Sequence, residues 1–120
     1  MNWRPNAAQK AANARTNQLV YVEVSRIHGW GLFAREPLQE GLYLGTYLGP
    51  AARRNGSHVL WVDEGDGWIG RRGFNRLRYL NHSKPPNAEF NGFELYTCRP
   101  IAADDFARMW LDPPIRSRPA

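Results

Sequence analysis

The sequence predicts a mostly β domain with little helix. Short apolar or alternating runs recur along its 120 residues, glycine-rich turns separate them, and helix-forming patterns are few and short. This length suits one domain with a modest core. We place that domain at residues 19–112, with a polar lead-in at 1–18 that we expect to be disordered in part and a proline- and arginine-containing tail at 113–120.

The first elements are a short helix and a strand. Residues 7–15 hold good helix formers but no clear apolar stripe, so the helix that they predict is short. After it, Val20, Val22 and Val24 alternate with polar or aromatic residues. This period of two predicts a strand that carries its valines on one face.

A glycine-punctuated stretch follows the strand. Gly29 and Gly31 flank Trp30, ahead of an apolar run at 32–34. Two glycines at this spacing permit positive φ and a close backbone approach to a ligand. We reject the Gly-x-Gly-x-x-Ala dinucleotide fingerprint because no helix pattern follows and Pro37 interrupts the segment. On this feature alone, a structural turn is the prediction.

The rest of the chain alternates between turns and short strands. Gly45 lies inside one strand and marks a bulge or a close approach. The acidic turn at 63–67 lacks the ligand spacing of a calcium loop and is typical of a hairpin. The predicted elements are a turn at 36–41, a strand at 42–49, a basic loop at 51–57, a strand at 59–62, the acidic turn, a helical turn at 71–78, a turn at 88–92, a strand at 93–101, a turn or helix start at 102–105 and an irregular segment from 106 onward.

Composition limits the classes of function. The net charge of +5 favours polyanions or acidic proteins as partners, with a solvated basic face as the alternative. Cys98 is the only cysteine, which excludes an internal disulfide and a zinc cluster of several thiolates, and we predict no metal site. The chain has no membrane-spanning run or secretory signal, so we expect a cytoplasmic location, or a nuclear one in a eukaryotic cell.

The most informative stretch is residues 78–87, Arg-Tyr-Leu-Asn-His-Ser-Lys-Pro-Pro-Asn. It places the amide of Asn81 beside the imidazole of His82, and both groups donate and accept hydrogen bonds. Adjacent residues of an extended segment point in opposite directions, so a ligand there can take side-chain contacts from one and backbone contacts from the other. Taken alone, this stretch is typical of a polar turn before a proline-stiffened loop.

Three motifs in a fixed order change that interpretation. They are Gly29-Trp30-Gly31 with the apolar run after it, Tyr47-Leu48-Gly49, and the stretch at 78–87. In this order and spacing the chain resembles the SET-domain family of protein-lysine methyltransferases, over about residues 19–105, and its length resembles the minimal SET domains of viruses and bacteria. The resemblance implies a β-clip fold of several short strands in small sheets, with a knot-like crossing near the active site.

The resemblance also implies a cofactor and roles for particular residues. S-adenosylmethionine would be the methyl donor, without a metal. The residues implied to bind it are Gly29, Trp30, Gly31, Arg78, Asn81 and His82. Tyr47 is implied as the catalytic residue, at the junction of the cofactor pocket and the substrate-lysine channel. A narrow apolar channel beside a sulfonium would lower the pKa of a substrate lysine, ordinarily about 10.4, so that the amine can attack. Catalysis would then rest mainly on alignment.

Two positions depart from the family pattern. Lys84 stands where the family often has a zinc-binding cysteine, so we expect that zinc module to be absent. Trp110 falls where the family has a tyrosine near the transferring methyl, and it offers only an N–H donor. Trp110 could still stack on adenine or form a wall of the substrate channel.

Three hypotheses follow from the sequence. The first is a methyltransferase that acts on a lysine of a protein substrate, for example a histone or a DNA-binding protein. A homodimer is a further expectation. The second is a weak or inactive SET-like module that binds cofactor, peptide or both. The third is a basic β domain associated with nucleic acid.

Overall fold

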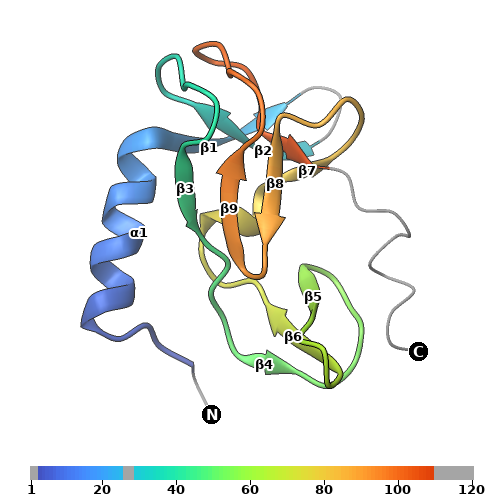
Figure 1. The fold of residues 1–120 in the computed structure, drawn as a ribbon. Coiled ribbons are helices and arrows are strands. Elements are labelled where there is room, and N and C mark those ends of the chain that lie inside the picture. Colours follow the sequence, from blue (N-terminus) through green and yellow to red (C-terminus); the bar gives the residue numbers. More distant parts are fainter. Residues whose placement is uncertain (1–2, 26–28, 110–120) are drawn as a thin grey trace.

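The computed structural model describes residues 3–25 and 29–109, and strands dominate this part of the chain (Figure 1). The described strands form four small sheets, ordered β1-β2, β3-β9-β8, β4-β6-β5 and β10-β7. The elements are α1 (Ala7–Leu19), β1 (Val20–Ser25), β2 (Gly29–Ala34), β3 (Tyr43–Thr46), β4 (Ala51–Ala52), β5 (Val59–Asp63), β6 (Trp68–Arg72), the 3₁₀ helix η1 (Arg76–Tyr79), β7 (Asn81–His82), β8 (Ala88–Asn91), β9 (Glu94–Thr97) and β10 (Arg108–Met109).

Helix α1 runs longer than the sequence indicated and packs beside β3 (Figure 1). A capping box starts it: Asn6 Oδ1 accepts from the Gln9 backbone N–H at 2.8 Å, and Gln9 Oε1 accepts from the Asn6 N–H at 2.8 Å. Thr16 is buried against Gly45, where an added Cβ would lie 2.4 Å from the Thr16 hydroxyl. The cap and this contact explain why most of the lead-in expected at 1–18 is helical. The domain boundaries stay predictions.

Strands β1 and β2 form an antiparallel hairpin in which Val20 pairs with Ala34. The alternation predicted for the valines begins in the core, where Val20 is fully buried, and ends in solvent, where Val24 is 57% exposed. The glycine-punctuated stretch, for which the pattern alone predicted a turn, forms β2. The stretch is a strand and not a turn because every residue of β2 pairs with a residue of β1.

The β3-β9-β8 sheet confirms one expectation and corrects another. The register shifts between Tyr43 and Gly45, as the glycine inside that strand predicted. The predicted turn at 88–92 is wrong: β8 occupies most of it, and the turn centres on Gly92, which has a φ of +63°. Ala88 is 1% exposed and pairs with Thr97, so tertiary pairing overrides the turn-like composition.

The β4-β6-β5 sheet lies at one end of the molecule (Figure 1). The acidic turn joins β5 to β6 as a hairpin, with Asp63 opposite Trp68, as predicted. Asp63 Oδ1 accepts from the Gly65 N–H at 2.9 Å and closes that turn. The predicted helical turn at 71–78 is shorter than expected, because its first residues complete β6 and only η1 is helical.

The core lies between the sheets and η1. Its fully buried side chains come from six different segments and are Val20, Leu32, Leu44, Leu77, Leu95 and Ile101. Leu77 is the inward-facing residue of η1, so the same short helix that anchors itself in the core also presents Arg78 and Tyr79 to the surface beside β7. Within the described residues, no helix has the length and apolar character needed to span a bilayer.

The segment at 105–109 crosses between β2 and β7. On one side, the Ala107 N–H donates to the carbonyl of Leu32 at 2.8 Å. On the other side, β10 runs parallel to β7, with Arg108 opposite Asn81. Residues far apart in the sequence therefore meet at one point. β7 is held there by β10, the last strand of the described residues.

Candidate functional site

Residues of the first and third motifs meet in a surface pocket of about 380 Å³. Ligand-binding pockets commonly have volumes of roughly 300–1,000 Å³. Trp30 comes from β2, and Arg78 to His82 come from η1, the residue after it and β7. The lining residues are Trp30, His58, Arg78, Tyr79, Leu80, Asn81 and His82. Four of the predicted site residues thus share one cavity, although some fifty positions separate Trp30 from the rest.

Aromatic side chains form one wall of this first pocket. Trp30 is 59% exposed, and its ring lies 6.1 Å from the ring of Tyr79. Arg78 lies over the Tyr79 ring at 4.8 Å and donates from Nη2 to the Tyr79 hydroxyl at 2.6 Å. An exposed tryptophan beside a tyrosine that a guanidinium contacts offers two tilted aromatic faces to an aromatic or cationic ligand.

Gly31 lets β7 approach β2. A Cβ added there would lie 3.1 Å from the Phe33 ring and 3.3 Å from Asn81 Nδ2, which is tighter than ordinary contact. Gly29 starts the strand with a φ of +68°, which disfavours other residues. Neither glycine lines the pocket. Gly31 lets Asn81 pack close to β2, so that Asn81 and Trp30 line the same pocket.

The backbone of β7 is held by the crossing segment. Its Asn81 N–H donates to the Ala107 carbonyl at 3.3 Å, and the Ser83 N–H donates to the Met109 carbonyl at 3.0 Å. This pairing fixes one edge of Asn81 and His82. His82 is exposed and faces the first pocket.

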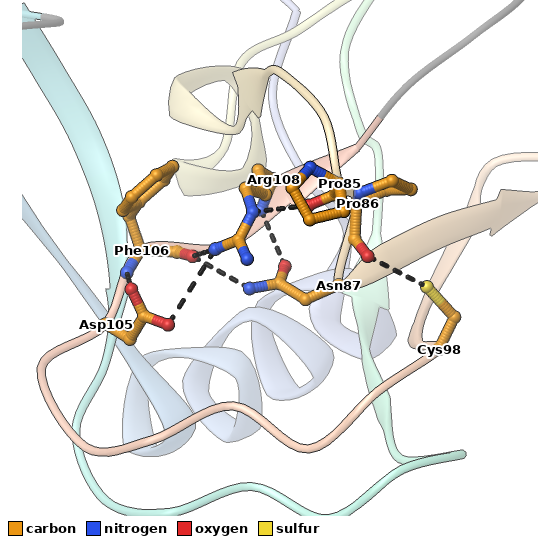
Figure 2. Close-up of polar contacts among 7 residues, drawn as sticks. All are labelled: Pro85, Pro86, Asn87, Cys98, Asp105, Phe106 and Arg108. Atoms are coloured by element: carbon orange, nitrogen blue, oxygen red, sulfur yellow. Dashed lines mark hydrogen bonds and ion pairs between the residues drawn. The ribbon is translucent and has the colours of Figure 1, made fainter.

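Asn87 connects the third motif to the crossing segment (Figure 2). Its side chain is 2% exposed; Nδ2 donates to the Phe106 carbonyl at 3.0 Å, and Oδ1 accepts from the Arg108 N–H at 2.8 Å. The Arg108 side chain adds further contacts: Nε donates to the Pro85 carbonyl, and Nη1 donates to the Phe106 carbonyl at 3.4 Å and lies 3.7 Å from an Asp105 carboxylate oxygen. The loop after β7 and the segment before β10 are therefore tied to each other by side chains as well as backbone.

A second, narrower cavity of about 150 Å³ adjoins the first. It shares His58, Arg78 and Leu80 with the first pocket. The rest of its lining is mostly apolar and consists of Tyr47, Val59, Leu60, Leu77, Phe90 and Met109. An apolar cavity of this small volume suits an extended aliphatic chain better than a ring system.

Tyr47 lies inside this second cavity and is 5% exposed. Its hydroxyl donates to the backbone carbonyl of His58. Burial raises the pKa of Tyr47 to about 12, and the positive charge of Arg78 opposes that rise. The hydroxyl is therefore protonated throughout the physiological range and acts as a hydrogen-bond donor, not as a base.

His58 is a site residue that the sequence did not indicate; we had interpreted it as an ordinary polar residue. It borders both cavities, its backbone accepts from Tyr47, and its ring Nδ1 lies 3.0 Å from the Arg78 carbonyl oxygen. The one available signal is conformational: His58 has a φ of +61°, a region that few residues other than glycine adopt. That signal belongs to the structure and not to any motif.

The predicted substrate-channel residue Trp110 lies outside the described residues. Within the described part, no group of three or more His, Cys, Asp or Glu side chains is arranged to hold a metal ion. Lys84, which stands where the family often has a zinc-binding cysteine, is exposed.

Comparisons with known proteins give the same class of protein as the motifs. No protein-family model matches the chain. A histone-lysine N-methyltransferase of Arabidopsis thaliana, MEDEA, is 29% identical over 86 residues, which are 61% of this chain and 12% of that protein. The chain thus spans about an eighth of this curated relative.

Two solved structures resemble the fold. The methyltransferase domain of human PR domain-containing protein 2 matches with a TM-score of 0.64 at 20% identity, over 95% of this chain and 94% of that one. The methyltransferase domain of the human histone-lysine N-methyltransferase SETMAR matches with a TM-score of 0.65 at 18% identity, over 74% of this chain and 42% of that one. The mostly β fold is that of SET domains, and the resemblance to SET-domain methyltransferases is confirmed.

Proposed function

We propose that this chain is an S-adenosylmethionine-dependent protein-lysine N-methyltransferase. The observation that carries the proposal is the pair of adjoining cavities, one wide and edged by aromatic and amide side chains, the other narrow and apolar. A reaction that brings a large donor and an extended alkylamine to one point needs two such cavities with a common wall. Here that wall is formed by His58, Arg78 and Leu80.

The residues of the first pocket suit the donor. Trp30 and Tyr79 offer aromatic faces to its adenine or to its sulfonium, and Asn81 offers both a donor and an acceptor. Gly31 lets Asn81 come close to β2, where a side chain at position 31 would crowd it. When bound, this cofactor supplies a methyl group on a positively charged sulfur.

The second cavity suits the aliphatic part of a lysine. Leu60, Leu77 and Phe90 give the cavity apolar walls, and Tyr47 contributes a hydroxyl group to its lining. Apolar walls disfavour an ammonium group, so they favour the neutral amine that the reaction requires. The substrate that we propose is a lysine side chain of a protein, in keeping with the histone-lysine methyltransferase name of the distant relative. A cytoplasmic location and a homodimer stay predictions.

The test is calorimetric titration with S-adenosylmethionine and with its demethylated product, S-adenosylhomocysteine. We expect both to bind, and Asn81→Ala to weaken both by about tenfold, because a polar group of the ligand loses its partner. Asn91→Ala, at the exposed end of β8, is the matched control and should bind normally. Absence of binding by the unsubstituted protein at millimolar ligand would end the proposal.

Turnover is measured separately, by transfer of labelled methyl groups to a mixture of basic proteins. Transfer above the Asn81→Ala background distinguishes an enzyme from a binding module with the same pocket. Binding of both compounds without any transfer would favour the inactive module instead.

A further inference from the structure

We propose that His58 is the base that accepts the proton of the substrate ammonium, an inference that rests on the proposed methyl transfer. The observation behind it is the position of His58: the residue lines both cavities, and one nitrogen of its ring is held by a hydrogen bond to the backbone.

The hydrogen bond of His58 determines its tautomer. Nδ1 lies 3.0 Å from the carbonyl oxygen of Arg78. A carbonyl oxygen only accepts, so Nδ1 must carry the hydrogen. In the neutral ring the lone pair is then on Nε2, the nitrogen that points away from this bond. The same arrangement, with Nδ1–H held and Nε2 available, makes histidine a general base in hydrolases.

Other residues of the narrow cavity do not fit this role. Tyr47 is protonated, and its hydroxyl already donates to the His58 carbonyl. Arg78 is a cation and offers no lone pair. The remaining described lining residues of that cavity are apolar, and His82 borders only the wider pocket. Among the described residues of the narrow cavity, His58 is therefore the one side chain able to take a proton.

The need for a base follows from the apolar walls. A lysine with an ordinary pKa of about 10.4 is almost entirely charged at neutral pH, and an ammonium group entering an apolar cavity loses its hydration. In the proposed step, an ammonium proton passes to Nε2 and leaves the amine its lone pair. A nitrogen–carbon bond then forms to the methyl group while the carbon–sulfur bond breaks, and the electron pair of that bond stays on sulfur. The imidazolium returns its proton to water, because His58 is exposed.

The chain offers a closely matched substitution. Asparagine tolerates the left-handed conformation that His58 adopts, and its amide N–H reaches the position of Nδ1. His58→Asn therefore keeps the backbone and the donor to Arg78 but removes Nε2. Ser57→Ala, at the exposed neighbouring position, controls for changes in the loop.

The titratable and charged groups around His58 come from three segments. They are Tyr47 after β3, Arg78 and Tyr79 on η1, and His82 on β7. All four are present in both proteins, so the ratio of wild-type to His58→Asn rates isolates the contribution of the His58 side chain. The comparison uses kcat for methyl transfer at saturating donor and basic-protein substrate, from pH 7 to pH 10.

We expect wild type to exceed His58→Asn by about 100-fold at pH 7.5, the usual scale of general-base catalysis. The ratio should fall below about threefold at pH 10, where the lysine loses its proton to solvent. Ser57→Ala should follow wild type throughout. Equal rates, or a ratio that does not change with pH, would overturn the role of base. No methyl transfer by wild type at any pH would overturn the proposed function together with this inference.

A measurement independent of activity tests the same geometry. Nitrogen NMR of protein with labelled imidazole rings distinguishes the two neutral tautomers, and the signal missing in His58→Asn assigns the residue. At pH 9 we expect His58 with hydrogen on Nδ1 and a bare Nε2. Hydrogen on Nε2 would overturn the inference even if methyl transfer occurs.

Discussion

Gly73 has no room for a side chain beside Tyr47. An added Cβ would lie 2.4 Å from the Tyr47 hydroxyl oxygen and 2.7 Å from the Arg78 Cβ, and neither neighbour is a flexible end. The Gly73 N–H also donates to the His58 carbonyl at 2.8 Å, the same carbonyl that accepts from Tyr47. One backbone oxygen therefore holds both the Tyr47 hydroxyl and the residue after β6 beside His58.

Gly73→Ala should destabilise the protein by about 2 kcal/mol, the scale of overpacking in a filled interior. It should also weaken donor binding, because Arg78 must move. The matched control is Gly56→Ala, whose added Cβ would meet only ordinary contacts at 3.8 Å and beyond. Urea unfolding measures the first effect and calorimetry the second. Equal stability of the two variants would contradict the packing argument.

Tyr47 gives the folded protein a pH dependence at alkaline pH. Its pKa is raised from 10.0 to about 12, chiefly because burial disfavours the phenolate. The folded state thus holds this proton more tightly than the unfolded chain does. The resulting stability is complete below pH 10 and is lost as the pH rises through 12.

Between pH 9 and pH 12, the free energy of unfolding should fall by about 2 kcal/mol more in wild type than in Tyr47→Phe. Tyr21, whose pKa is raised chiefly by its hydrogen bond to Asp104, and Tyr96, whose pKa is raised chiefly by burial, are present in both proteins and cancel. Urea unfolding at each pH provides the measurement. Parallel pH profiles for the two proteins would show that Tyr47 titrates normally.

At the scale of elements, the short pairing of β7 with β10 is reinforced by a side chain. β7 and β10 pair over two residues each, and Asn87 supplies two further bonds, one to Phe106 and one to Arg108. A two-residue ladder is weak alone. The buried amide of Asn87 therefore contributes much of what holds the crossing segment against the third motif (Figure 2).

Asn87→Ala should destabilise the fold by about 2 kcal/mol, because it removes the acceptor of the Arg108 N–H and one of the two donors to the Phe106 carbonyl. Donor binding should fall with it, since β7 loses its support. Asn91→Ala, an exposed change of the same kind, should cost less than about 0.5 kcal/mol. Urea unfolding and calorimetry compare the two variants, and a small effect of Asn87→Ala would place the support of β7 elsewhere.

Predictions of individual elements succeeded where the local pattern and the tertiary pairing agree. The valine alternation gave β1, and the acidic turn gave the β5–β6 hairpin. Residues 88–91 carry a turn-like composition, yet pairing with β9 makes them a strand. The length of α1 was underestimated because Thr16, which packs against Gly45, gives no apolar signal in the sequence.

At the scale of the whole molecule, the fold and most candidate site residues could be predicted because the motifs are contiguous. Trp30 with its glycines and Asn81 with His82 are adjacent in sequence, so a pattern can indicate them. His58 could not be found this way. It enters the site through a backbone carbonyl and a ring nitrogen, and its partner Arg78 lies twenty positions away. Contacts of that kind exist only once the chain has folded.

If the proposed function holds, the pairing of β10 with β7 links ligand affinity to the local opening of that pair. Met109 lines the narrow cavity, and the backbone of β10 supports β7, so we expect the proposed ligands to bind only those molecules that have β10 in place. The apparent dissociation constant is the intrinsic one divided by that fraction. Binding in turn holds the strand in place, and ligand at 100 times its dissociation constant adds about 2.7 kcal/mol to the stability of the bound form. We therefore expect substitutions in β10 to change the measured affinity even where the substituted side chain contacts no ligand atom.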